Sequence, residues 1–356
     1  MPASSAAAPS PFKFLDAYQK EDAKAFFGRD REVRELFERI YLSNIILLYG
    51  ASGTGKSSLI RCGLANQFGE NDWLPIFVRR DGRMLSSLHR ALERRALSPM
   101  PPGLSLEEKI HNLYLDYFLP IYLVFDQFEE LFIQGDEHEQ GAFFDALSHL
   151  LGTIDRCTIL ISMREEYLAH LSDFEMVIPN LFANRQRLEP MSLPQLRDVI
   201  RGNARLFGID LEADVQTADL IIEQLRNKKG EVELPYLQIY LDRLYQRAKK
   251  RQTETGAPLR FDSAIIRQTR QLEDVLSDFL SEQIEALEAD LQSEGLDKKG
   301  LPLAVLFALV TSDRTRKSNT VSQVREEISK RFQVDTMYVD YCLQQLLQKR
   351  ILTFKE

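Results

Sequence analysis

The feature that most constrains this chain is the octapeptide Gly50-Ala51-Ser52-Gly53-Thr54-Gly55-Lys56-Ser57, which fits the pattern G-x-x-x-x-G-K-[ST]. An apolar run at residues 45–49 leads directly into it and predicts a buried strand, and the residues from Ser58 onward predict a helix. A strand, a glycine-rich turn and a helix in this order surround an anion with backbone N–H groups and a positive helix end. The octapeptide therefore predicts a phosphate-binding loop.

The last residues of this loop predict what it binds. Lys56 is expected to reach the β- and γ-phosphates of a nucleoside triphosphate, and the Ser57 hydroxyl is expected to bind Mg²⁺. The stretch from Gly50 to Ser58 is therefore expected to hold ATP or ADP together with Mg²⁺.

The composition is typical of a globular protein with two or three domains, since the chain has 356 residues, 44% hydrophobic and 28% charged. Residues 1–11 are rich in Ala, Ser and Pro and lack a basic segment, which predicts a disordered tail rather than a signal peptide. No apolar run approaches the ~18 residues of a membrane span. The three cysteines have no disulfide or metal spacing, so we expect a cytoplasmic protein without a membrane partner.

The charge argues against a dedicated nucleic-acid-binding protein, because the net charge is -8. The distribution is uneven, however, since the last 56 residues carry nine Lys and Arg against six Asp and Glu.

A regular alternation of strands and helices follows the phosphate loop. Further apolar runs predict strands at residues 74–78, 121–125 and 158–162, with a weak fifth strand at 186–188. Helical stretches separate them, and this pattern predicts a three-layer α/β domain whose parallel sheet is covered on both faces. We place this domain at residues 12–190.

The remaining chain is predicted to be helical. Ser192 and Gln195 form a capping box that begins a helical domain at residues 191–298. Residues 299–356 are expected to form a first helix, a polar turn, helices at 321–332 and 338–349, and a short strand at 351–354. A three-helix unit that ends in a strand predicts a winged-helix domain.

Four further residues are candidates for the chemistry. Asp126 ends an apolar strand, where a carboxylate can hold Mg²⁺ opposite Ser57. Glu129 and Glu130 follow, and either could act as the general base that activates water. Arg164 ends the next strand, where it would sense the γ-phosphate or form an ordinary ion pair.

These motifs together resemble the STAND class of P-loop ATPases, closest to the bacterial novel STAND group and related to NACHT proteins. The resemblance covers residues 12–356. Asp126-Gln127-Phe128-Glu129-Glu130-Leu131-Phe132 matches the extended Walker B segment of the group, and the parallel NACHT pattern puts Glu130 at the base position. The sensor strand is matched at residues 162–164 and the start of the helical domain at 188–192.

Two other segments extend the resemblance. Phe26-Phe27-Gly28-Arg29-Asp30 is similar to the h-h-G-R-[ED] segment of the family, which implies that Gly28 and Arg29 lie near the adenine. The segment at 233–238 resembles the family's proline segment, which implies that Pro235 contacts the nucleotide in the resting state, although Glu233 stands where the broader pattern has Gly.

The resemblance implies an α/β P-loop domain of the ASCE/AAA+-like kind and a molecular switch rather than a metabolic enzyme. Such proteins hold ADP in a closed monomer, exchange it for ATP on a trigger, and oligomerise to activate an effector, with slow ATP hydrolysis. The bacterial members are associated with defence and cell-death signalling. Effector and sensor domains are absent from this chain, so we expect it to be an isolated switch module.

Two other functions compete with this interpretation. The first is an AAA+-like ATPase that acts on DNA through its winged helix, as the basic excess of the last 56 residues would require. The second is a P-loop kinase or transferase, whose relatives seldom carry helical and winged-helix tails. A GTPase is disfavoured, because residues 227–230 (NKKG) have glycine where the guanine motif N-K-x-D requires aspartate.

Overall fold

The protein is described here by a computed structural model. It covers residues 11–13, 16–69, 71–153, 157–227, 230–269, 272–293, 295, 298–308 and 321–348. The chain divides into two compact units. The sheet unit comprises Ala17–Leu234 with Pro258–Arg260, and the helical unit comprises Met1–Asp16, Pro235–Ala257 and Phe261–Glu356. We describe each unit by itself.

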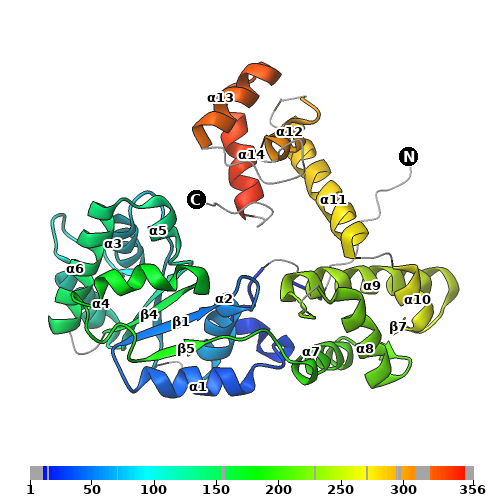
Figure 1. Cartoon of the computed structure of the whole chain (residues 1–356), viewed down its shortest axis with the longest axis horizontal. Helices are drawn as coiled ribbons and strands as arrows, with labels where there is room; N and C mark the ends of the chain where they lie inside the picture. The colour runs from blue at the N-terminus through cyan, green and yellow to red at the C-terminus, as the bar shows by residue number, and fades with distance from the viewer. Residues whose placement is uncertain are drawn as a thin grey trace. The chain divides into compact units, whose positions relative to one another are not determined.

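Five parallel strands form the centre of the sheet unit, in the order β2-β3-β4-β1-β5. Figure 1 labels the neighbouring strands β4, β1 and β5 of this sheet. In chain order they are β1 (Ile45–Gly50), β2 (Leu74–Val78), β3 (Ile121–Asp126), β4 (Cys157–Arg164) and β5 (Arg185–Arg187). The predicted parallel α/β sheet is confirmed.

The strands are apolar on both faces because helices cover both faces. Side chains alternate between two clusters along β1: Ile45 and Leu47 pack in one, and Ile46 and Leu48 pack in the other. A strand with this pattern cannot lie at a solvated surface, and its burial makes β1 a rigid support for the loop that follows it.

Different helices cover the two faces. One layer consists of α1 (Asp30–Ile40) and the helical segment after the phosphate loop. The other is built by α3 (Met84–Arg95), α4 (Leu106–Tyr117), α5 (Glu130–Gln134), α6 (Glu137–Thr153) and the 3-10 helix η4 (Glu165–Phe174). The sheet unit also contains η1 (Lys20–Ala25), α7 (Leu193–Leu206), β6 (Asp210–Leu211) and α8 (Asp214–Leu225). The capping box expected at Ser192 is present, since its amide donates to Oε1 of Gln195 at 2.9 Å.

The helix expected after the phosphate loop is composite. It consists of α2 (Lys56–Ser58), a π-helical turn η2 (Leu59–Gly63) and a 3-10 turn η3 (Leu64–Asn66). It packs closely on α1 at Gly63, where a Cβ atom would lie 2.4 Å from Cγ2 of Val33. The irregular hydrogen bonding therefore lies where the segment is pressed against its neighbour.

The helical unit contains most of α9 (Leu234–Thr255) and the helices α10 (Ser263–Gln268), α11 (Leu272–Ser293), α12 (Leu301–Phe307), α13 (Val321–Phe332) and α14 (Thr336–Gln348). Of the two residues of β7 (Arg260–Phe261), the first is assigned to the sheet unit and the second to the helical unit. A buried cluster joins α11 to α14 through side chains such as Leu287, Val305, Ile328 and Leu346.

The winged helix itself stays a prediction. The expected strand at 351–354 lies outside the described residues, as does most of the expected tail at 1–11. The domain boundaries at 190 and 298 also stay predictions, and we note that the division into compact units falls at Leu234, inside the predicted helical domain.

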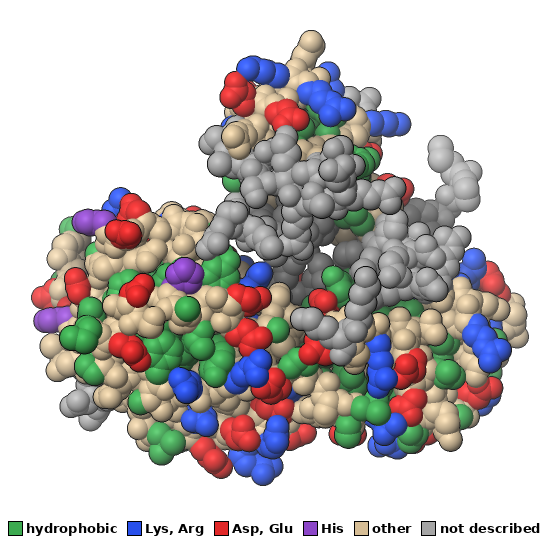
Figure 2. Space-filling model, viewed as in Figure 1, with side chains coloured by type: hydrophobic (Ala, Val, Ile, Leu, Met, Phe, Trp, Pro, Cys, Tyr) green, Lys and Arg blue, Asp and Glu red, His purple; other side chains and the backbone are tan. Residues whose placement is uncertain are grey.

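Acidic and basic side chains are interspersed on the face of the described residues seen in Figure 2. None of the helices that the structure describes is both long and apolar enough to cross a bilayer.

Two helical glycines provide a test of this packing. Gly63→Ala should lower the free energy of unfolding by about 1–3 kcal/mol, because the added methyl group overpacks the contact with Val33 and Phe26. Gly141 of α6 has no neighbour within 4 Å of its Cβ position, so Gly141→Ala should raise stability by about 0.5–1 kcal/mol through helix propensity. Urea unfolding measures both, and equal effects of the two substitutions would contradict the packing described here.

Candidate functional site

The phosphate loop, residues 50–57, has a backbone that only glycine accommodates at key positions. Gly53 and Gly55 have φ angles of +76° and +93°, in the left-handed region that L side chains rarely adopt. Gly50 is required for a different reason, because a Cβ atom there would lie 2.4 Å from the carbonyl oxygen of Leu188. The sequence pattern thus corresponds to a tight turn between β1 and α2.

Strand register brings distant candidate residues to one edge of the sheet. Gly50 of β1 pairs with Arg164 of β4, and Asp126 of β3 pairs with Ser162 of β4. Because all three strands are parallel, their carboxyl ends meet beside the phosphate loop, as is usual for ligand sites in sheets of this kind.

Ser57 and Asp126 have the arrangement expected of a magnesium site. The Ser57 hydroxyl donates to Oδ1 of Asp126 at 2.9 Å, and Asp126 is buried. Mg²⁺ prefers oxygen ligands and is held in such sites by one or two protein groups, phosphates and waters. These two oxygens therefore fit the ion, and no larger cluster of metal-ligating side chains occurs among the described residues.

Lys56 bends back onto the loop. Its Nζ donates to the carbonyl oxygens of Gly50 and Ala51 at 2.7 and 2.8 Å. Burial lowers the pKa of Lys56, while the nearby Glu129 carboxylate opposes that shift. Two carbonyl groups thus hold the ammonium group at the phosphate loop. When a phosphate binds, it would take their place as the partner of the ammonium group.

The buried Glu129 forms an ion pair with the half-buried Arg164. Oε1 of Glu129 lies 3.1 Å from Nε of Arg164, and Oε2 accepts from the Arg164 amide at 3.2 Å. Burial raises the pKa of Glu129 although Arg164 and Lys56 oppose the shift. Both oxygens of this carboxylate are therefore engaged in positioning the end of β4.

Glu130 has a different environment. It begins α5, and its carboxylate accepts no hydrogen bond from any residue that the structure describes. Burial raises the pKa of Glu130 to about 7, with Arg79 opposing and the Glu129 charge adding to the shift. A carboxylate with this pKa exchanges protons near neutrality, which is what a general base needs.

The turn between Asp126 and these glutamates is strained, since Gln127 has a φ of +60°. The amide of Phe128 donates to the carbonyl of Ser162 at 2.9 Å, and the Phe128 ring is fully buried. The turn that precedes both glutamates is thus held between β4 and the core.

Arg29 supports the phosphate loop from behind. Its side chain is buried and donates to Oε1 of Glu32 (2.9 Å) and to the carbonyls of Thr54 (3.0 Å) and Glu189 (2.9 Å). Gly28, with φ +78°, presents its carbonyl to Nε2 of Gln195 at 2.9 Å. The segment around Gly28 therefore joins the phosphate loop to α7.

The other candidate residues are placed as follows. Ser52 is exposed, and Thr54 is buried with its hydroxyl donating to the carbonyl of Ala51 at 2.9 Å. The Ser58 hydroxyl accepts from the Tyr18 amide at 3.1 Å, which anchors the N-terminal segment. Pro235 begins the part of α9 that belongs to the helical unit, so its contact with a nucleotide stays a prediction.

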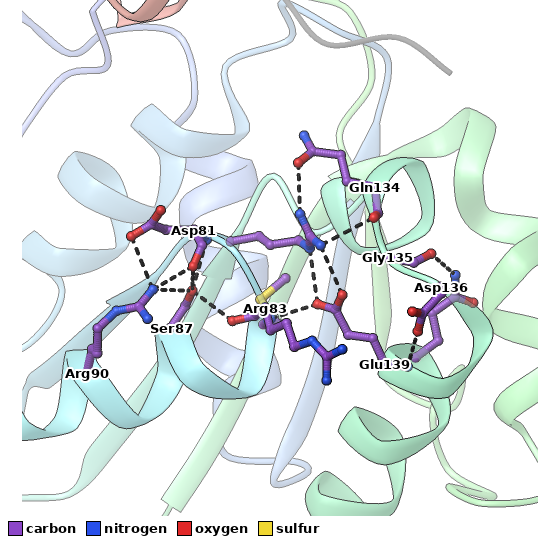
Figure 3. Close-up of polar contacts among 11 residues, drawn as sticks. Asp81, Arg83, Ser87, Arg90, Gln134, Gly135, Asp136 and Glu139 are labelled. Carbon is purple, nitrogen blue, oxygen red and sulfur yellow. Dashed lines mark hydrogen bonds and ion pairs between the residues drawn. The ribbon is translucent and has the colours of Figure 1, made fainter. Parts of the chain in front are cut away.

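The sequence analysis missed an arginine network behind α5 (Figure 3). Arg80, two residues after β2, forms an ion pair with Glu139 of α6 at 2.9 Å and donates to Oε1 of Gln134 of α5 at 2.8 Å. Glu139 also accepts from the amide of Met84 at 2.8 Å. The sequence did contain a signal for this network, because Arg79-Arg80 directly follows the strand at residues 74–78. The carboxyl end of that strand lies at the same edge of the sheet as the phosphate loop.

A family model described as novel STAND NTPase 1 matches residues 11–356. No protein among the curated ones matches the sequence.

Two solved structures from Aeropyrum pernix are similar in fold. The ORC1 protein in complex with DNA is 16% identical, with a TM-score of 0.51 over 92% of this chain and 84% of its own. The ORC2 protein in its ADPNP–ADP complexes is 14% identical, with a TM-score of 0.52 over 98% of this chain and 89% of its own. At this identity the likeness shows the fold alone, a P-loop ATPase fold.

The buried ion pair behind α5 generates a stability prediction. Glu139→Gln should lower the free energy of unfolding by about 3 kcal/mol at pH 7, because Arg80 is left as a buried, unpaired charge. Burial alone would raise the pKa of Glu139, but the hydrogen bonds from Arg80 and Met84 hold this pKa below its ordinary value of 4.5. The contribution is therefore present above that value and lost as the pH falls through the lower, folded-state pKa.

Unfolding of the two proteins across pH 3–7, a range that brackets the ordinary carboxyl values, measures this effect. Glu137→Gln, at an exposed position of the same helix, is the matched control and should change little. A pH-independent difference between wild type and Glu139→Gln would contradict the assignment to the ion pair.

Proposed function

Because this chain belongs to the novel STAND NTPase family, we propose that it is an ATP/ADP-dependent signalling switch. In this proposal the module binds ATP or ADP with Mg²⁺, hydrolyses ATP slowly, and couples the bound nucleotide to domain opening and self-association.

One observation carries the proposal. The phosphate loop, the Ser57–Asp126 pair and the two glutamates meet at one edge of the sheet, although they come from segments about 70 residues apart. Phosphate, divalent cation and attacking water each have a matching group there. Nothing comparable would be needed in a module that only packs against other proteins.

Each residue has a distinct task in this mechanism. The loop amides and Lys56 hold the phosphates, and Ser57 with Asp126 would hold Mg²⁺, which neutralises charge that develops on the phosphate oxygens. Glu130 accepts the proton of the attacking water, since its carboxylate is unengaged among the described residues and its pKa is about 7. Glu129 positions Arg164 through two contacts at 3.1 and 3.2 Å.

Nucleotide-dependent opening requires that the two units sense the ligand differently, because a ligand shifts an equilibrium only through differential contact. Leu234 ends the main segment of the sheet unit, and its Cδ1 lies 3.2 Å from the Cβ position of Gly55 in the phosphate loop. The chain therefore leaves the sheet unit directly beside the phosphates' expected position. We propose that Pro235, the next residue, contacts ADP in a closed form and that Arg164 with the γ-phosphate favours an open form.

The bacterial family resemblance supports a cytoplasmic role in defence or cell-death signalling, with self-oligomerisation on activation. The adenine is expected beside Gly28 and Arg29, where the segment is held by Gln195 and by the phosphate loop.

A DNA-acting ATPase is the alternative, favoured by the fold likeness to an ORC1 protein that was solved with DNA. Two of the basic residues of α13, Arg325 and Lys330, give it little support, because they are engaged locally. Arg325 pairs with Asp340 at 2.8 Å, and Lys330 pairs with Glu326 at 2.6 Å. A recognition helix needs such cations free to contact phosphates and bases.

Substitutions at the paired glutamates test the mechanism. Glu130→Gln should keep ATP binding while lowering kcat by about 10²-fold or more, because it removes only the base. Glu129→Gln should lower kcat less, and Lys56→Ala should abolish ATP binding in calorimetry. Wild-type kcat should fall as the pH drops through about 7, since the Glu130 carboxylate must be ionised.

Unchanged ATP affinity in Lys56→Ala would refute the proposed site. A larger kcat loss in Glu129→Gln than in Glu130→Gln would assign the role of general base to Glu129.

A substitution at Pro235 tests the switch. Pro235→Ala should weaken ADP binding more than ATP binding and should increase self-association, because it removes a contact specific to the closed form. Small-angle X-ray scattering and light scattering, with ADP and with a non-hydrolysable ATP analogue, measure compactness and mass. Identical compact profiles with both nucleotides, in wild type and variant alike, would refute the hinge.

A further inference from the structure

Arg61 has a position that the proposed mechanism does not use. It lies on η2, five residues after Lys56, on the π-helical turn that follows the phosphate loop. Single π-helical turns of this kind are rare and occur frequently at functional sites. The sequence analysis assigned Arg61 no role.

The guanidinium of Arg61 faces the metal-binding carboxylate. Its NH2 lies 3.6 Å from Oδ2 of Asp126, while Oδ1 of the same carboxylate accepts from Ser57 at 2.9 Å. The side chain of Arg61 is 28% exposed and that of Asp126 only 5%. Each oxygen of the buried Asp126 carboxylate therefore has a partner: Oδ1 accepts a hydrogen bond from the Ser57 hydroxyl, and Oδ2 forms an ion pair with Arg61.

The position of Arg61 is held from its other side by an aromatic ring. Its guanidinium carbon lies 3.9 Å above the ring of Phe77 in β2, within the range of a cation–π contact. The charge is therefore kept beside Asp126 rather than free in solvent.

This placement has an electrostatic consequence at a phosphate site. An ionised Asp126 beside the loop repels the β-phosphate of a bound nucleotide, and in most such sites the divalent cation removes this repulsion. Arg61 supplies a positive charge to the same carboxylate without a metal. It also repels a divalent cation that approaches Asp126.

We propose that Arg61 is a built-in counter-ion of Asp126, which lets the site retain a nucleoside diphosphate without a divalent cation. The inference rests on the proposed function, since it concerns the same nucleotide site. It adds a residue to that site and a property: ADP binding that depends little on Mg²⁺, and hence a resting state insensitive to the metal.

The test measures ADP affinity by calorimetry, once with MgCl₂ and once with EDTA, on the full chain. The quantity of interest is the ratio of the two dissociation constants. Arg61→Met keeps an unbranched side chain that can pack on Phe77 and removes the charge, so the ratio of the EDTA to the Mg²⁺ value should rise about tenfold over wild type. Arg61→Lys should stay near wild type, and so should Arg34→Met, which removes an exposed charge on α1.

A double variant separates this role from a merely structural one. In Arg61→Met with Asp126→Asn, the charge that Arg61 balances is gone, so ADP binding in EDTA should return to within about threefold of wild type. A variant that had only damaged the fold would not be rescued by a second substitution.

The outcomes distinguish the inference from the function beneath it. If wild type binds ADP but the ratio in Arg61→Met is unchanged or smaller, or if the double variant is not rescued, the counter-ion role is overturned and the nucleotide site stands. If wild type binds ADP in neither condition, the proposed function is overturned, and the inference with it.

Discussion

The buried guanidinium of Arg29 is the interaction on which the geometry of the site depends. A charge this deeply buried requires pairing and hydrogen bonds, and the two terminal nitrogens of Arg29 donate to the Glu32 carboxylate and to the carbonyls of Thr54 and Glu189. These three partners come from α1, from the phosphate loop and from the segment that leads into α7. Satisfying one buried charge therefore joins three segments far apart in the chain and holds the loop in shape.

The neighbouring glutamates show how environment divides one residue type into two roles. Both carboxylate oxygens of Glu129 contact Arg164, one through an ion pair with its side chain and one through a hydrogen bond from its amide. Glu130 begins a short helix with its carboxylate unengaged among the described residues and its pKa raised by burial to about 7. Adjacent positions differ this much because only Glu129 meets the side chain and the amide of Arg164 at the end of β4. Carboxylates held in different environments are a common basis of acid–base assignment in enzymes.

Supporting contacts extend well beyond the residues that would touch a ligand. Arg80 and Glu139 join the end of β2 to α5 and α6, and α5 carries Glu130 at its first position. Arg61 of η2 lies beside Asp126, and its guanidinium stacks on Phe77 of β2. The edge of the sheet is therefore a polar network whose members restrain one another, and this restraint is what holds reacting groups in place.

The amino-acid sequence by itself determined the parallel α/β fold, the phosphate loop and the set of acidic and basic candidates beside it. It could do so because these features are local: apolar runs of strand length, glycines that permit positive φ, and a carboxylate directly after a strand. The division of labour between Glu129 and Glu130, and the partners of Arg29, Arg61 and Arg80, were decided only by the tertiary structure. Those assignments depend on which segments meet at the sheet edge, and on burial and charge that residues far away in sequence supply. The spacing of residues along the sequence does not determine which of them come into contact in the folded protein.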